Sequence, residues 1–173
     1  LPTALESLRK LPYKKLLLIS NNCRSNASVQ VKENNQDLHQ WILQFPHSQI
    51  ENRFEIAYPD IDILYFDHFS PEFCLTERQG VGQARRLLAI EALAQIKAER
   101  IASKWIWCTD ADAQFSQNYL EEPPKSCGIQ LSGYIHKPAP KELLLYELSL
   151  RYYSLGLEYA NSPFAFPTIG STI

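Results

Sequence analysis

The chain has no methionine, no long apolar run and no excess of basic residues among its 173 positions. Without a stretch of about 18 or more apolar residues, we expect no transmembrane segment, and no secretory signal peptide is recognisable. The 17 basic and 19 acidic residues leave a net charge of −2, which gives no reason to expect a nucleic-acid partner. Because the chain begins at Leu1, we expect that the native start is missing or was removed.

The four cysteines are far apart and form no Cys-x-x-Cys pair, so neither a zinc site nor a disulfide framework is indicated: Cys23, Cys74, Cys108 and Cys127. We therefore expect reduced thiols and a cytoplasmic location, with the inner face of the membrane as the alternative. A length of 173 residues is enough for a single domain with its own core.

Apolar runs and helical periodicity alternate along the chain. The apolar runs predict strands at residues 16–19, 61–66, 105–108 and 127–135. Apolar residues three and four apart predict helices over 3–10, 36–45, 80–100 and 140–159. This alternation predicts an α/β fold with a doubly wound, mostly parallel sheet and helices on both faces.

Two acidic residues, Asp110 and Asp112, follow the apolar run at 105–108 directly. In an extended chain they project the same way, with Ala111 between them, and two such carboxylates repel each other unless a cation neutralises them. Carboxylate oxygens completed by water and substrate phosphates suit Mg²⁺ or Mn²⁺. The alternative is a solvated cap on a surface turn, in which Asp-x-Asp occurs by chance.

Two other segments carry candidate binding residues. Asn21 and Asn22 follow the apolar run at 16–19, either as a plain polar turn or as a loop that reads the polar edges of a ligand. Arg85 and Arg86 stand in the first turns of the helix predicted after Gly80, where the helix dipole disfavours cations unless an anion lies nearby. Two alternatives stay open for these arginines: they contact a phosphate, or they lie on a solvated helix face.

Four segments, in this order, resemble the family 2 glycosyltransferases of the GT-A fold. Residues 3–8 and the run at 16–19 with Asn21-Asn22 are similar to the early helix and second strand that help to hold the nucleotide. The remaining segments look like the family's glycine-then-alanine-arginine helix start, its Asp-x-Asp metal motif and its acceptor-side glycine loop: Gly80-Val81-Gly82-Gln83-Ala84-Arg85-Arg86, Asp110-Ala111-Asp112 and Thr168-Ile169-Gly170-Ser171.

The resemblance implies a truncated GT-A, Rossmann-like domain that transfers a sugar from a UDP- or GDP-linked donor to an unknown acceptor, with inversion. Residues 1–125 would be the nucleotide-sugar-binding half and 126–173 the beginning of the acceptor-side half. Asp112 would bind Mn²⁺ or Mg²⁺, and Asp110 the ribose or the metal. Nucleotide contacts would come from Asn21, Asn22, Arg85 and Arg86, and the acceptor-side loop from Gly170 and Ser171.

The chain departs from the family in three respects. It starts after the family's first strand, and it has asparagines where the second-strand loop usually carries an acidic residue. The family's catalytic base lies in the second half, beyond Ile173, and neither Glu147 nor Glu158 is a convincing substitute. We therefore assign no catalytic base, and the chain is either a fragment of a transferase or lacks activity. Two alternatives stay open: a sugar-phosphate nucleotidyltransferase, and a non-catalytic nucleotide-binding or interaction module.

Overall fold

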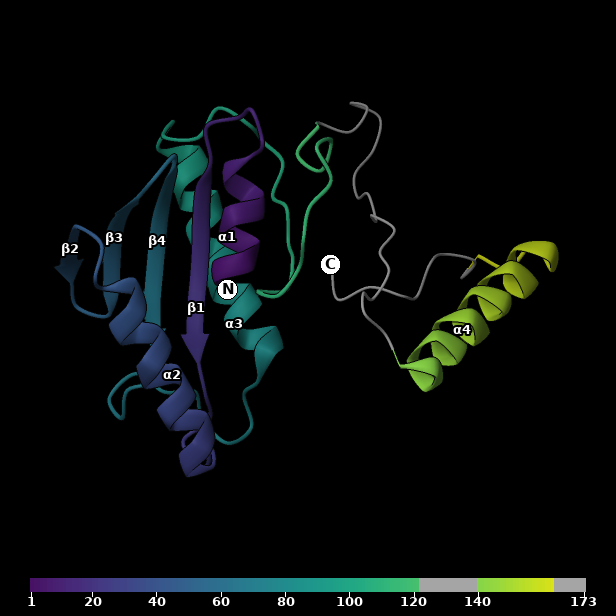
Figure 1. The fold of residues 1–173 in the computed structure, drawn as a ribbon, viewed down its shortest axis with the longest axis horizontal. Helices are drawn as coiled ribbons and strands as arrows, with labels where there is room; N and C mark the ends of the chain where they lie inside the picture. Colours follow the sequence, from purple (N-terminus) through teal and green to yellow (C-terminus); the bar gives the residue numbers. More distant parts are fainter. Residues whose placement is uncertain (122–139, 164–173) are drawn as a thin grey trace. The chain divides into compact units, whose positions relative to one another are not determined.

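A computed structural model describes residues 1–121 and 140–163 of the chain (Figure 1). These residues belong to two compact units. One is Glu6–Ile106, and the other comprises Leu1–Leu5 and the described residues from Trp107 onward. The boundary predicted between residues 125 and 126 lies outside the described residues. None of the helices that the structure describes is both long and apolar enough to cross a bilayer.

Helices and strands follow one another in this order: α1 (Pro2–Arg9), β1 (Leu16–Asn22), α2 (Val29–Ile42), β2 (His47–Ile50), β3 (Arg53–Tyr58), β4 (Ile61–His68), α3 (Val81–Lys97) and α4 (Lys141–Tyr159). The predicted helices 3–10, 80–100 and 140–159 are confirmed as α1, α3 and α4. Helix α2 begins well before the predicted residue 36, because Ser28 caps it: its hydroxyl oxygen accepts a hydrogen bond from the N–H of Val31 at 3.4 Å.

The four described strands form one mixed sheet in the order β1-β4-β3-β2, in which only β1 and β4 run parallel. The predicted doubly wound, mostly parallel sheet is therefore wrong. The reason is that the apolar runs did not reveal β2 and β3: β3 pairs with β4, and β2 pairs with β3, both in antiparallel orientation. Along Arg53–Tyr58, buried and exposed side chains alternate, and Asp60 in the following turn has a φ of 62°. In the sequence, polar and apolar residues alternate over Arg53-Phe54-Glu55-Ile56, and with the Pro-Asp turn that follows this was the available signal for a hairpin.

The prediction of a buried strand at residues 105–108 is also wrong. Residues 101–121 contain no strand, and the side chain of Ile106 is 41% exposed. A strand exists only where neighbouring strands accept its backbone hydrogen bonds, and an apolar run alone does not supply them. The strand predicted at 127–135 lies outside the described residues.

Helices α2 and α3 pack on opposite faces of the sheet (Figure 1). Tyr65 of β4, which is fully buried, faces α2 and shares a 3.0 Å hydrogen bond with His39. Consecutive residues of a strand point to opposite faces. Phe54 packs edge-on against His39, whereas the neighbouring Arg53 reaches Glu91 of α3, with 3.6 Å between nitrogen and oxygen. Thus β4 and β3 form the centre of the core, with one helix on each side.

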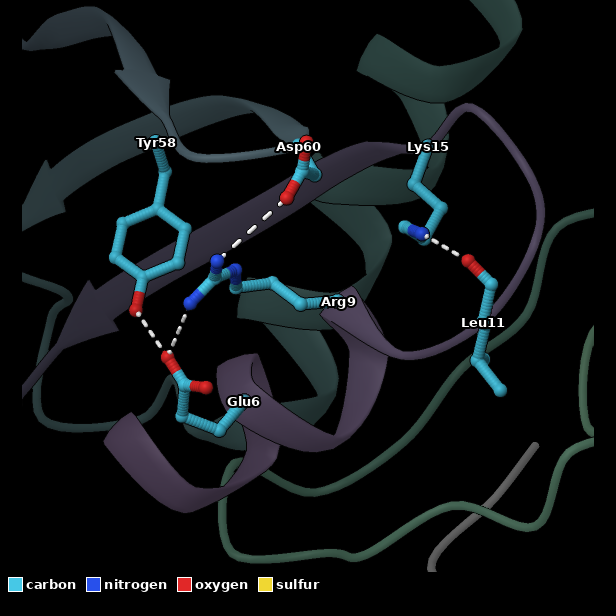
Figure 2. A network of polar contacts seen from close by, with 6 residues as sticks. All are labelled: Glu6, Arg9, Leu11, Lys15, Tyr58 and Asp60. Carbon is cyan, nitrogen blue, oxygen red and sulfur yellow. Dashed lines mark hydrogen bonds and ion pairs between the residues drawn. The ribbon is translucent and has the colours of Figure 1, made fainter.

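A polar network at the surface connects α1 with the turn between β3 and β4 (Figure 2). The Glu6 carboxylate accepts hydrogen bonds from Arg9 at 2.9 Å and from the Tyr58 hydroxyl at 3.3 Å. Arg9 also lies 3.6 Å from the Asp60 carboxylate. The hydrogen bond from Arg9 lowers the pKa of Glu6. Because these groups are exposed, we expect the network to orient α1 while adding little to stability.

Replacing Ile63, which is 1% exposed in β4, tests the position of the core. Ile63→Ala should lower the free energy of unfolding by about 2–5 kcal/mol, because it leaves a cavity between the sheet and its helices. Urea unfolding followed by circular dichroism measures the change. Ile50→Ala in β2 is the matched control, since Ile50 is 67% exposed, and it should change stability by less than about 0.5 kcal/mol. An equal loss of unfolding free energy in both variants would contradict the position of Ile63 in the core.

Candidate functional site

Polar side chains gather where β1 and β4 end. The two strands pair in parallel from Leu16 opposite Asp62 to Asn22 opposite His68, so their carboxyl ends meet at one edge of the sheet. Open α/β sheets bind ligands just beyond such ends. The side chains gathered here are those of Ser20, Asn21, Asn22, Asp67 and His68. The sheet therefore retains one edge at which two parallel strands end together, although most of its strand pairs are antiparallel.

Asn21, a predicted nucleotide contact, is buried at this edge. Its amide nitrogen donates to the backbone oxygen of Asn35 and to the hydroxyl of Tyr65, each at 2.8 Å. Burial raises the pKa of Tyr65, so this hydroxyl stays protonated. The neighbouring Asn22 is half-buried and donates to the backbone oxygen of Ser20 at 3.1 Å. Asn21 thus connects β1 to α2 and β4, and a ligand contact for either asparagine stays a prediction.

Asp67 and His68 organise the loop that follows β4. Asp67 accepts hydrogen bonds from the backbone N–H groups of Phe69 at 3.0 Å and Ser70 at 2.9 Å, and also from the Ser70 hydroxyl. The Nδ1 atom of His68 lies 2.8 Å from the Ser20 hydroxyl. Burial lowers the pKa of His68, and the nearby Asp67 charge opposes that shift. The histidine is therefore neutral near pH 7.

The loop after β1 meets the start of α3, although the two segments are far apart in the sequence. Arg24 donates through Nε to the backbone oxygen of Gln79 at 2.8 Å. A Cβ atom placed on Gly80 would lie 3.1 Å from a terminal nitrogen of Arg24. Gly80 therefore leaves room for the guanidinium. The sequence places Arg24 in the polar loop after residues 16–19, where it is the one basic residue, but it did not reveal the contact with Gln79 and Gly80.

Arg85 and Arg86 lie in the early turns of α3, as predicted. Arg85 is half-buried and Arg86 is exposed. The helix begins at Val81, and its first free N–H groups favour an anion at this end. Phosphate contact by these arginines stays a prediction.

A cleft of about 500 Å³ opens beside this sheet edge. Its walls come from three segments: the loop after β1, with Arg24 and Ser25; helix α2, with Lys32; and the loop after β4, with Phe69 and Ser70. No cleft was predicted from the sequence, because these residues come from three separate segments that only folding brings together.

Asp110 and Asp112 belong to the other unit. They lie on a turn in which the N–H of Ala113 donates to the backbone oxygen of Asp110 at 3.3 Å. Asp110 is half-buried and Asp112 is exposed. Within the described ranges, no three His, Cys, Asp or Glu side chains are grouped to hold a metal. Two carboxylates still fit Mg²⁺ or Mn²⁺ when phosphate and water oxygens complete the coordination. Gly170 and Ser171 lie outside the described residues.

Comparisons with protein-family models, with curated proteins and with solved structures found no match to this chain. Functional inference therefore depends on the chain's own motifs and geometry.

Buried His68 and half-buried His39 predict how the free energy of unfolding depends on pH. Burial lowers the pKa of His68 and of His39 in the folded state. Below the unfolded value of about 6.5, the unfolded chain therefore binds protons that the folded chain does not. The free energy of unfolding should fall as the pH decreases from 7.5 to 5.5, and it should fall less in His68→Gln. Denaturant titrations across this range measure both slopes.

The exposed His47 provides the control. His47→Gln should retain most of the wild-type pH dependence, because it leaves His68 unchanged and removes only one contribution to the lowered pKa of His39. If His68→Gln also retains the wild-type slope, burial of a neutral His68 is excluded.

Proposed function

We propose that this chain is the nucleotide-sugar-binding part of a metal-dependent glycosyltransferase, which moves a sugar from a UDP- or GDP-linked donor to an acceptor. The observation that carries the proposal is the contact of Arg24 with Gln79 and Gly80. It joins two segments of the resemblance, the loop after β1 and the glycine-led start of α3.

Donor binding at this place follows from charge and topology. The Arg24 guanidinium and the N-terminus of α3 both favour an anion, and a nucleoside diphosphate supplies two phosphates. Only the parallel pair β1–β4 is needed to form this edge, so the antiparallel strands β2 and β3 are no argument against donor binding there. The Arg85 and Arg86 side chains would add positive charge.

Asp112 would hold Mn²⁺ or Mg²⁺, with Asp110 as a second ligand or a ribose contact. When bound, the metal would act as a Lewis acid that offsets the charge on the leaving diphosphate. We assign no residue as catalytic base. A cytoplasmic location is part of the same proposal.

Thermal unfolding with nucleotides tests the metal-binding role of Asp112. In the wild type, UDP or GDP with Mn²⁺ at about 100 times the dissociation constant should add roughly 2.7 kcal/mol, which raises the midpoint by roughly 5–10 °C. A chelator should remove this shift. Asp112→Asn should also remove it, because a neutral amide is a poor ligand for a hard cation.

Asp37→Asn is the matched control, since Asp37 is an exposed carboxylate on α2. It should retain the full metal-dependent shift. An unchanged shift in Asp112→Asn would exclude the metal-binding role, and no shift in the folded wild type would exclude donor binding by this chain. Pyrophosphate release from a nucleoside triphosphate would instead favour a nucleotidyltransferase.

A further inference from the structure

The cleft between α2 and the loops after β1 and β4 has the dimensions of a small-molecule site. Its volume of about 500 Å³ lies within the range of metabolite pockets. None of its lining residues belongs to the Asp-x-Asp turn, and all of them lie in the Glu6–Ile106 unit. Ligand binding here would require neither a metal nor Asp112.

The charged side chains that line the cleft are those of Arg24, Lys32 and Glu33. Their net positive charge favours a small anion. Arg24 is held through Nε by the backbone oxygen of Gln79, and this bond orients the guanidinium. Its terminal nitrogens carry the remaining N–H donors, in a planar geometry that matches phosphate oxygens. Lys32 also lines the cleft, and its Nζ donates to the backbone oxygen of Ser25, the neighbour of Arg24 in the chain, at 3.3 Å. A phosphate group would satisfy both cations at once.

The wall formed by the loop after β4 is fixed before any ligand binds. Asp67 accepts two backbone hydrogen bonds at the beginning of the loop, and the N–H of Cys74 donates to the backbone oxygen of Ser70 at 2.8 Å. The N–H of Leu75 then donates to the backbone oxygen of Cys23 at 2.9 Å. A preformed wall lowers the entropic cost of ordering a ligand.

The other side chains that line the cleft favour a ligand whose second part is a hydroxylated sugar rather than an aromatic base. Glu33 and Gln36 are polar side chains of α2 at the cleft. A carboxylate accepts hydrogen bonds from ligand hydroxyls, and an amide both donates and accepts them. Phe69 is only 8% exposed, so it offers little open ring surface for base stacking.

We propose that this cleft binds a sugar phosphate, with the phosphate between Arg24 and Lys32 and sugar hydroxyls at Glu33 and Gln36. This site shares Arg24 with the proposed donor site, but it needs neither the metal nor Asp112 and so does not rest on the donor proposal. Binding in the presence of a chelator therefore tests the cleft even if the donor proposal fails.

Isothermal titration calorimetry of the whole chain with glucose 6-phosphate, in a chelator at low ionic strength, tests the proposal. We expect saturable binding with one ligand per chain. Glucose and inorganic phosphate should each bind at least about tenfold more weakly, because each lacks one of the two recognised parts. UMP should also bind at least about tenfold more weakly, because the cleft offers little ring surface for its base. No saturable binding of glucose 6-phosphate, or equal binding of inorganic phosphate or UMP, would overturn the assignment.

Three variants locate the bound groups. Lys32→Gln and Arg24→Gln should each weaken glucose 6-phosphate binding about tenfold or more, through loss of a charge-assisted hydrogen bond. Glu33→Gln should weaken glucose 6-phosphate without weakening inorganic phosphate. Lys14→Gln, at an exposed lysine outside the cleft, should bind as the wild type does. Circular dichroism melting confirms that each variant is folded, and wild-type affinity in folded Lys32→Gln would overturn the site.

Discussion

The parallel pairing of β1 with β4 is the constraint on which the other functional features depend. It places Asn22 opposite His68, and with them the two loops that follow these strands. Those loops then pair through Arg24 and Leu75 in an isolated parallel bridge. Without this pairing, the cleft would lose two of its three walls. The antiparallel strands β3 and β2 extend the sheet away from this edge.

Buried polar groups at this edge are stabilised by hydrogen bonds. Removing a polar group from water without a partner costs several kcal/mol at most and about 1–3 kcal/mol in typical proteins. Asn21 and Asp67 avoid that cost through bonds to backbone groups and neighbouring side chains. The same burial keeps His68 neutral and Tyr65 protonated. Stability at this edge therefore depends on protonation as well as on packing.

The two proposed sites use different chemistry. The donor proposal rests on the anion-binding start of α3 and on a family resemblance, and the Asp pair of the other unit is proposed as the metal ligand. The cleft depends on two cations, a fixed loop and polar side chains of α2, all within one unit. Arg24 borders both regions, since it contacts Gln79 and lines the cleft. One arginine thus connects the glycine-led helix with the cleft.

The sequence alone determined the elements that local periodicity specifies. Helices α1, α3 and α4 follow from apolar residues three and four apart, and β1 and β4 from their apolar runs. It did not reveal strand direction, because the β3 hairpin depends on pairing with β4. The same reason explains the error at Trp105, whose apolar run has no strand partner among the described residues. Only tertiary structure brought Arg24 to Gly80 and Lys32 to the cleft, because contacts between distant segments leave no periodic pattern in either segment.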